Sequence, residues 1–100
     1  MTINVQHVNM PTSEATTEYV TKKLNKLGDR YHWVIAAKVH FKLENDPTDK
    51  GKLCEIELSA PGPRIFAKSN EAHFEKAAVA TLNDLERQLK KLNEKRNKRF

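Results

Sequence analysis

The sequence has 100 residues, enough for one domain, with a formal net charge of +5 and a mean hydropathy of −0.74. No apolar run approaches the roughly 18 residues that a membrane span needs, and the N-terminus lacks the basic and apolar regions of a signal peptide. The single cysteine, Cys54, has no partner for an internal disulfide. We therefore expect a soluble cytoplasmic domain with no membrane contact.

The positive charge is concentrated toward the C-terminus. Residues 1–50 carry 7 basic and 6 acidic side chains, whereas residues 51–100 carry 11 and 7. The last 14 residues hold seven Lys and Arg side chains against one acid, Glu94. Such a segment indicates a polyanionic partner, either nucleic acid or an anionic membrane surface.

The first third of the chain predicts a strand followed by a helix. Residues 2–8 alternate apolar and polar side chains, which is typical of a short strand. Pro11 ends this strand, and Thr12 or Ser13 is suited to cap a helix over residues 13–27. Gly28 stands where a residue in the left-handed conformation would end that helix.

Three further strands and a long helix follow. Residues 33–44 alternate and predict a half-buried strand, with an apolar face of Ile35, Ala37, Val39, Phe41 and Leu43. A polar turn leads to a strand at 52–60, and Pro61-Gly62-Pro63 leads to a short strand at 64–68. Ser69 and Asn70 are candidate caps for a second helix from about 70 to the mid-90s. Its apolar stripe consists of Phe74, Ala78, Leu82, Leu85, Leu89 and Leu92.

The predicted fold is α+β with the order β-α-β-β-β-α, similar to a double-stranded-RNA-binding domain. One apolar stripe per helix and one apolar face per strand place both helices on one face of a four-stranded sheet. The opposite face is expected to be solvated and charge-paired, and it carries Lys38, His40, Lys42, Glu55, Glu57, Arg64, Phe66 and Lys68. We assign residues 1–96 to this single domain and residues 97–100 to a basic, frayed tail.

Basic side chains gather on the outer sides of both predicted helices. The second helix carries Lys76, Arg87, Lys90 and Lys91 opposite its apolar stripe. The first carries Lys22 and Lys26 one turn apart, Lys23 beside Tyr19, and Arg30 just past its end. If the helices lie side by side, these residues form one surface suited to phosphates. The alternative interpretation is a solvated face that only keeps the domain soluble.

No pattern in the sequence is typical of catalysis or metal binding. The four histidines lack paired spacing, Cys54 alternates with Ile56 and Leu58 like a small core residue, and a glycine-rich phosphate loop is missing. We therefore expect no enzyme activity, no metal or cofactor site and no small-molecule substrate. Tyr31 and Trp33 are able to stack on bases, but we favour a role as anchors of a helix-to-strand corner.

The element order and the segment Asp84-Leu85-Glu86-Arg87-Gln88-Leu89-Lys90-Lys91 resemble the ribosome hibernation-promoting factor family, also called the ribosome-associated inhibitor A or sigma-54 modulation protein family. The second helix of that family typically carries Lys-Leu-Glu-Arg-Gln-Leu-x-Lys. Leu85 to Leu89 match this segment, and Lys91 matches its final lysine. The Ala67-x-Ser69 and Lys23-Leu24-Asn25-Lys26-Leu27 segments are also similar. Asp84 replaces the usual first lysine, and His73-Phe74-Glu75 replaces the usual Asp-Met-Tyr.

The resemblance implies a hibernation factor that binds ribosomal RNA of the small ribosomal subunit and occludes the path of messenger and transfer RNA in stationary phase or stress. The chain looks like the short form, which is associated with paired, inactive ribosomes, and we expect it to be monomeric when free. The resemblance carries over six RNA contacts: Lys22, Lys23, Lys26, Arg87, Lys90 and Lys91. Charge geometry alone adds Arg30, Lys76, Lys95 and Arg96. A generic double-stranded-RNA-binding module and a protein-interaction regulator of a sigma factor remain alternatives.

Overall fold

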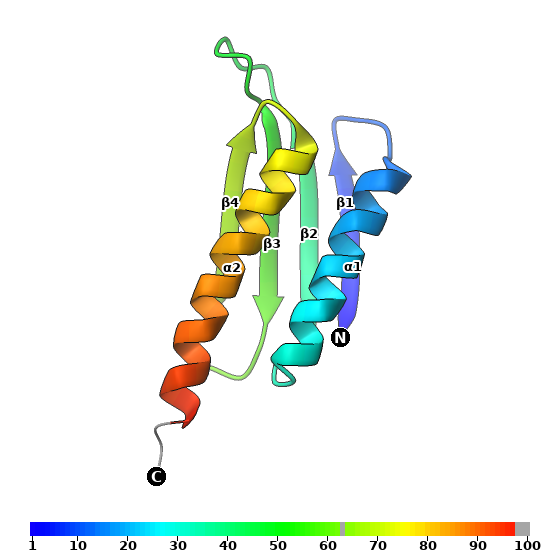
Figure 1. The fold of residues 1–100 in the computed structure, drawn as a ribbon. Coiled ribbons are helices and arrows are strands. Elements are labelled where there is room, and N and C mark those ends of the chain that lie inside the picture. The colour runs from blue at the N-terminus through cyan, green and yellow to red at the C-terminus, as the bar shows by residue number, and fades with distance from the viewer. Residues whose placement is uncertain (63, 98–100) are drawn as a thin grey trace.

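The computed structural model describes residues 1–62 and 64–97, which form one four-stranded sheet and two helices (Figure 1). The elements in chain order are β1 (Thr2–Val8), α1 (Glu14–Arg30), β2 (Ala36–Leu43), β3 (Lys52–Ser59), β4 (Ile65–Glu71) and α2 (Phe74–Asn97). The spatial order of the strands is β1-β2-β3-β4. β1 and β2 are parallel because α1 carries the chain back between them, and the other neighbours are antiparallel. The predicted α+β fold is confirmed.

Both helices cover the same face of the sheet, as the sequence predicted. In Figure 1, α1 lies over β1, and α2 crosses β3 and β4. The core forms between the helices and the sheet, where Val20 and Leu24 of α1 meet Phe41 and Ile56 of the central strands and Leu85 of α2. Within the predicted stripe of α2, four residues are buried and the two end residues, Phe74 and Leu92, are half-buried. The apolar patterning therefore placed most of the core correctly. Ile35 and Leu43 of the predicted strand face are exceptions: both are exposed, because Ile35 precedes β2 and Leu43 is its last residue.

The outer face of the sheet is charge-paired, also as predicted. Glu55 accepts contacts from two neighbouring strands, with its carboxylate oxygens 3.1 Å from Lys42 Nζ and 3.6 Å from Lys68 Nζ. Arg64 Nε lies 3.2 Å from Glu57 Oε2. Cross-strand pairing thus occupies most of the basic side chains on this face.

The first helix ends later than Gly28 predicted. Ser13 is the N-cap, and its Oγ accepts a 3.3 Å hydrogen bond from the Thr16 N–H. The helix continues through Gly28 to Arg30, and the Tyr31 N–H donates to the Leu27 carbonyl. Gly28 is not in the left-handed conformation; a Cβ there would lie 2.9 Å from Met1 Cε. The glycine therefore makes room for the N-terminus instead of ending the helix.

The predicted capping of the second helix by Ser69 or Asn70 is wrong. Both residues lie in β4, paired with Cys54 and Leu53 of β3. Asn70 Oδ1 accepts a 2.7 Å hydrogen bond from the Gly51 N–H, and Asn70 Nδ2 donates to Asp46 at 3.3 Å. The side chain that looked like a helix cap instead ties the β2–β3 loop to the sheet. α2 consequently begins at Phe74, and of the predicted tail only Asn97 is described, as the last residue of α2.

Candidate nucleic-acid interface

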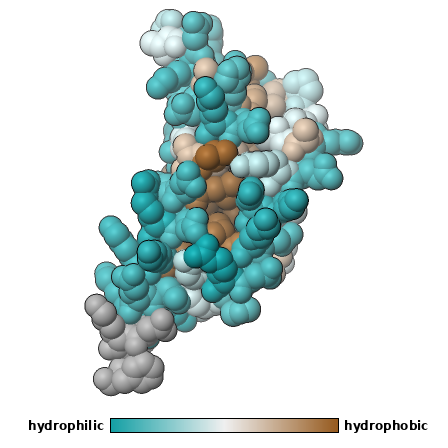
Figure 2. Space-filling model, viewed as in Figure 1, coloured by the Kyte–Doolittle hydropathy of each residue, from teal (hydrophilic) through white to brown (hydrophobic). Residues whose placement is uncertain are grey.

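The two helices lie side by side and leave a furrow between them. We define the interhelical furrow by the residues that line a hollow of about 370 Å³: Tyr19, Lys23, Lys26, Leu27 and Arg30 of α1, and Val79, Leu82, Asn83 and Glu86 of α2. It continues toward the C-terminal end of α2 into a wider hollow that Arg87 and Lys90 also line. Figure 2 shows a hydrophobic strip between the helices with hydrophilic side chains on both sides. The furrow is thus apolar at its floor and charged at its rim.

Helix α1 contributes the densest part of the basic rim. Lys23, Lys26 and Arg30 are spaced three and four residues apart, so they share the flank of α1 that faces α2. Lys23 Nζ lies 5.7 Å from the centre of the Tyr19 ring, a cation–π contact that holds the ammonium group over the furrow wall. Lys22 lies outside the furrow, on the outer surface of α1 beside Glu18. Among the predicted residues of α1, three therefore converge and one does not.

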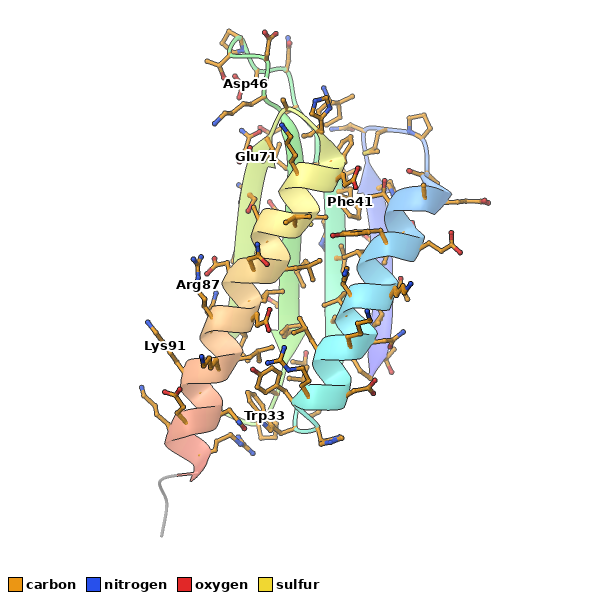
Figure 3. The ribbon with its side chains drawn as sticks, in the orientation of Figure 1. Trp33, Phe41, Asp46, Glu71, Arg87 and Lys91 are labelled. Atoms are coloured by element: carbon orange, nitrogen blue, oxygen red, sulfur yellow. The ribbon has the colours of Figure 1, made fainter. Side chains whose placement is uncertain are left out.

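Helix α2 presents its predicted basic residues in more than one direction. Lys90 and Arg87 line the continuation of the furrow. The guanidinium of Arg87 lies 3.7 Å from Asp84 Oδ1, and in Figure 3 the Arg87 and Lys91 side chains point away from α1. Asp84 occupies the place of a lysine in the family segment, and it adds a negative charge beside Arg87. The α2 side of the furrow is therefore less basic than the α1 side.

An ion pair joins the two helices across the furrow. Arg30 donates from Nη1 to Glu86 Oε1, linking the end of α1 to the middle of α2. The hydrogen bond to Glu86 raises the pKa of Arg30 above its ordinary value, so the guanidinium stays charged. Glu86 was missed by sequence reasoning, since nothing local indicates that residue 86 faces residue 30. It neutralises one cation of the rim while no polyanion is present.

The remaining predicted cations lie apart from the furrow. Lys76 is exposed near the start of α2, eleven residues or roughly 16 Å along the helix from Arg87. Lys95 and Arg96 line a separate hollow with Trp33 and Leu92. Three of the ten predicted residues, Lys23, Lys26 and Arg30, line the furrow itself, and Arg87 and Lys90 line its continuation. The other five lie outside both hollows.

Tyr31 and Trp33 anchor the corner between α1 and β2, as favoured from the sequence. Tyr31 is buried, and its ring meets Trp33 edge-on at 6.1 Å between centres. Trp33 Nε1 donates a 3.2 Å hydrogen bond to Asn93 Oδ1 of α2. The Arg96 guanidinium lies 4.6 Å from the centre of the Trp33 ring. The indole therefore joins the corner to the last turns of α2.

Cys54 is a core residue, in agreement with its alternation in the sequence. It is fully buried, and burial raises the pKa of its thiol to about 12. Across residues 1–62 and 64–97, no three His, Cys, Asp or Glu side chains gather into a potential metal site. Within the same ranges, no helix combines the length and apolar character needed to cross a bilayer.

The family model described as Sigma 54 modulation protein / S30EA ribosomal protein matches residues 3–97. The chain belongs to this family. Among solved structures, it is similar to a ribosomal subunit interface protein from Coxiella burnetii, with 22% identity and a TM-score of 0.82, over 94% of this chain and 99% of that one. It is also similar to the N-terminal domain of Protein Y from Thermus thermophilus, with 30% identity and a TM-score of 0.77, over 92% and 99% of the two chains. The family membership inferred from the element order and the α2 segment is thus confirmed.

Proposed function

We propose that this S30EA-family chain binds the small ribosomal subunit through the basic rim of the interhelical furrow. By occupying the path of messenger and transfer RNA, it silences the ribosome in stationary phase or stress. The proposal rests chiefly on the placement of Lys23, Lys26 and Arg30 along the furrow and of Arg87 and Lys90 along its continuation. Family membership and the description of the Coxiella burnetii relative as a ribosomal subunit interface protein support the choice of partner.

The state of the basic side chains on the helical side favours a phosphate-rich partner. Of the ten predicted cations, only Arg30 and Arg87 have ion pairs within residues 1–62 and 64–97. On the outer sheet face, by contrast, Lys42, Arg64 and Lys68 are already paired with Glu55 or Glu57. Unpaired lysines that neutralise phosphates displace the cations condensed on the nucleic acid, and this release drives binding at low salt. The helical side is therefore the better polyanion-binding face.

The proposed mechanism is steric and requires no bond to be made or broken. The domain is a slab with extents of 51 × 25 × 17 Å, and the furrow runs along its broad helical side. When this side lies on ribosomal RNA, the sheet and its charge-paired face project away from the contact. A body of this size then fills space that the displaced RNA would need.

Sedimentation with purified small subunits tests the proposal, together with repression of translation in vitro. The triple variant Lys23→Glu, Lys26→Glu and Lys90→Glu reverses three charges at the furrow rim without touching the core. The matched control Lys38→Glu, Lys50→Glu and Lys52→Glu makes the same charge change away from the furrow. We expect the furrow variant to lose both activities and the control variant to keep most of each.

Two results would contradict this assignment. Equal losses in both triple variants would mean that overall charge, and not the furrow, determines binding. Equal binding to an unrelated RNA duplex, added as a competitor, would indicate a general double-stranded-RNA-binding module. The circular dichroism and melting temperature of each variant serve as the folding control. We expect both to stay close to those of the unmodified chain, because folded proteins tolerate charge changes at exposed positions.

A further inference from the structure

We propose that the interhelical furrow receives one unpaired base of the RNA, while the rim binds the phosphates on either side of that base. The inference rests on the proposed RNA-binding function and assigns a second role to the same surface. Phosphate binding by the rim accounts neither for the apolar floor of the furrow nor for the Asn83 side chain that lines it.

The floor of the furrow is apolar where phosphate binding alone would not require it. Val79 is 39% exposed in the second turn of α2, and the nearly buried Leu27 and Leu82 line the same hollow. The half-buried Tyr19 ring forms the wall on the α1 side. Bases that leave a stack pack on aromatic and apolar side chains of this kind. The exposed Val79 beside the Tyr19 ring therefore offers a contact surface for a flat, apolar group.

Asn83 supplies the polar group that a base edge would need. Its side chain lines the furrow, and no hydrogen bond of its amide is found within residues 1–62 and 64–97. Asparagine is also a poor residue for a helix interior compared with alanine. An amide offers a donor and an acceptor side by side, which is the pattern that reads a base edge in two simultaneous hydrogen bonds.

The size and charge of the furrow favour a base over a protein side chain. A hollow of about 370 Å³ lies near the lower limit of small-molecule sites, a size that suits a single base. Lys23, Lys26 and Arg30 stand on the same rim, where the phosphates that flank an inserted base would pass. An apolar side chain from a ribosomal protein would fill the floor but would leave this rim without a counter-charge.

The test uses chemical probing of small subunits with the full chain and the variant Asn83→Ala. The matched control is Asn25→Ala, which removes an exposed asparagine from the outer side of α1. Base-specific reagents such as dimethyl sulfate report base contacts, and hydroxyl radicals report backbone contacts. We expect Asn83→Ala to weaken binding roughly tenfold and to re-expose one protected base. Backbone protection should persist at saturating protein, and the salt dependence should be unchanged because no phosphate contact is lost.

A second variant, Val79→Trp, fills the furrow without changing charge, and Ile35→Trp is its control at an exposed site elsewhere. It should expose the same base as Asn83→Ala. Weaker binding of Asn83→Ala with no base exposed would overturn the inference in favour of a protein side chain. Unchanged binding and unchanged probing with both furrow variants would overturn it as well. In either case, loss of binding by the rim triple variant would leave the proposed function standing, so the two failures are distinguishable.

Discussion

Removing the charge of Glu86 is expected to strengthen RNA binding. Glu86→Gln keeps the shape of the side chain and its hydrogen-bonding oxygen, but it frees the guanidinium of Arg30 from an ion pair across the furrow. The freed Arg30 then makes one additional phosphate contact, which steepens the slope of log K against log salt by about 0.7–0.9. Because of this steeper slope, the gain in affinity of the variant over the unmodified chain is about threefold larger at 50 mM salt than at 200 mM salt. The melting temperature should fall by less than roughly 4 °C, because the pair is 59% and 41% exposed at its two ends.

The assay is a salt titration of a fluorescently labelled chain against purified small subunits, with Glu18→Gln as the control. Glu18 is exposed on the outer side of α1 and forms no ion pair within residues 1–62 and 64–97. A gain for Glu86→Gln that is equal at 50 mM and 200 mM salt would refute the release of Arg30. A loss of affinity would show that Glu86 positions Arg30 for RNA and does not compete with it.

The further predictions concern stability and the burial of Cys54. Gly51→Ala should destabilise the fold by about 1–3 kcal/mol in urea titration, because Gly51 has φ +109° and a Cβ would collide with the Glu44 carbonyl oxygen. Gly28→Ala should instead stabilise the fold by about 0.5 kcal/mol, because alanine favours a helix and only the flexible end of Met1 must move. Because burial raises the pKa of the Cys54 thiol from 9.0 to about 12, its contribution to stability is complete below pH 9 and is lost as the pH rises toward 12. Alkylation of Cys54 at pH 8 should therefore follow unfolding, and rapid labelling of the folded chain would contradict its burial.

The sequence predicted those features of the fold that depend on local periodicity. The stripe of α2 and the alternation of β2 and β3 identify most of their buried residues, because burial repeats every three to four residues in a helix and every two in a strand. Ile35 and Leu43 fit the alternation but are exposed, since they lie at the ends of β2 where no helix covers them. Signals at element ends were weaker. Asn70 has the chemistry of a cap and also that of a cross-loop hydrogen-bond donor and acceptor, and only the sheet register shows that the second role applies.

The furrow was only partly predictable, because it forms between two segments that lie far apart in the chain. Lys23 was placed beside Tyr19 from the spacing of four residues, and the structure confirms the contact. Glu86 and Arg30 are separated by 56 residues, so no pattern within one helix reveals their pairing. A helical wheel places Asn83 on the same side of α2 as Lys90, away from the centre of the apolar stripe, so its position beside the furrow depends on the neighbouring helix. Side chains that interact between two helices could therefore be identified only from the tertiary structure.

If the furrow binds RNA as proposed, the acids on the helical side make that binding selective. Glu86 pairs with Arg30 inside the furrow, and Asp84 pairs with Arg87 on its flank, so the two strongest phosphate-binding side chains are both engaged in the free protein. The lysines of the rim remain available for the first, non-specific encounter. Binding then improves only where the RNA places phosphates close enough to displace each acid. A partner that enters the furrow gains the contact with Arg30, whereas a regular duplex that cannot enter it does not, and selectivity follows from this difference.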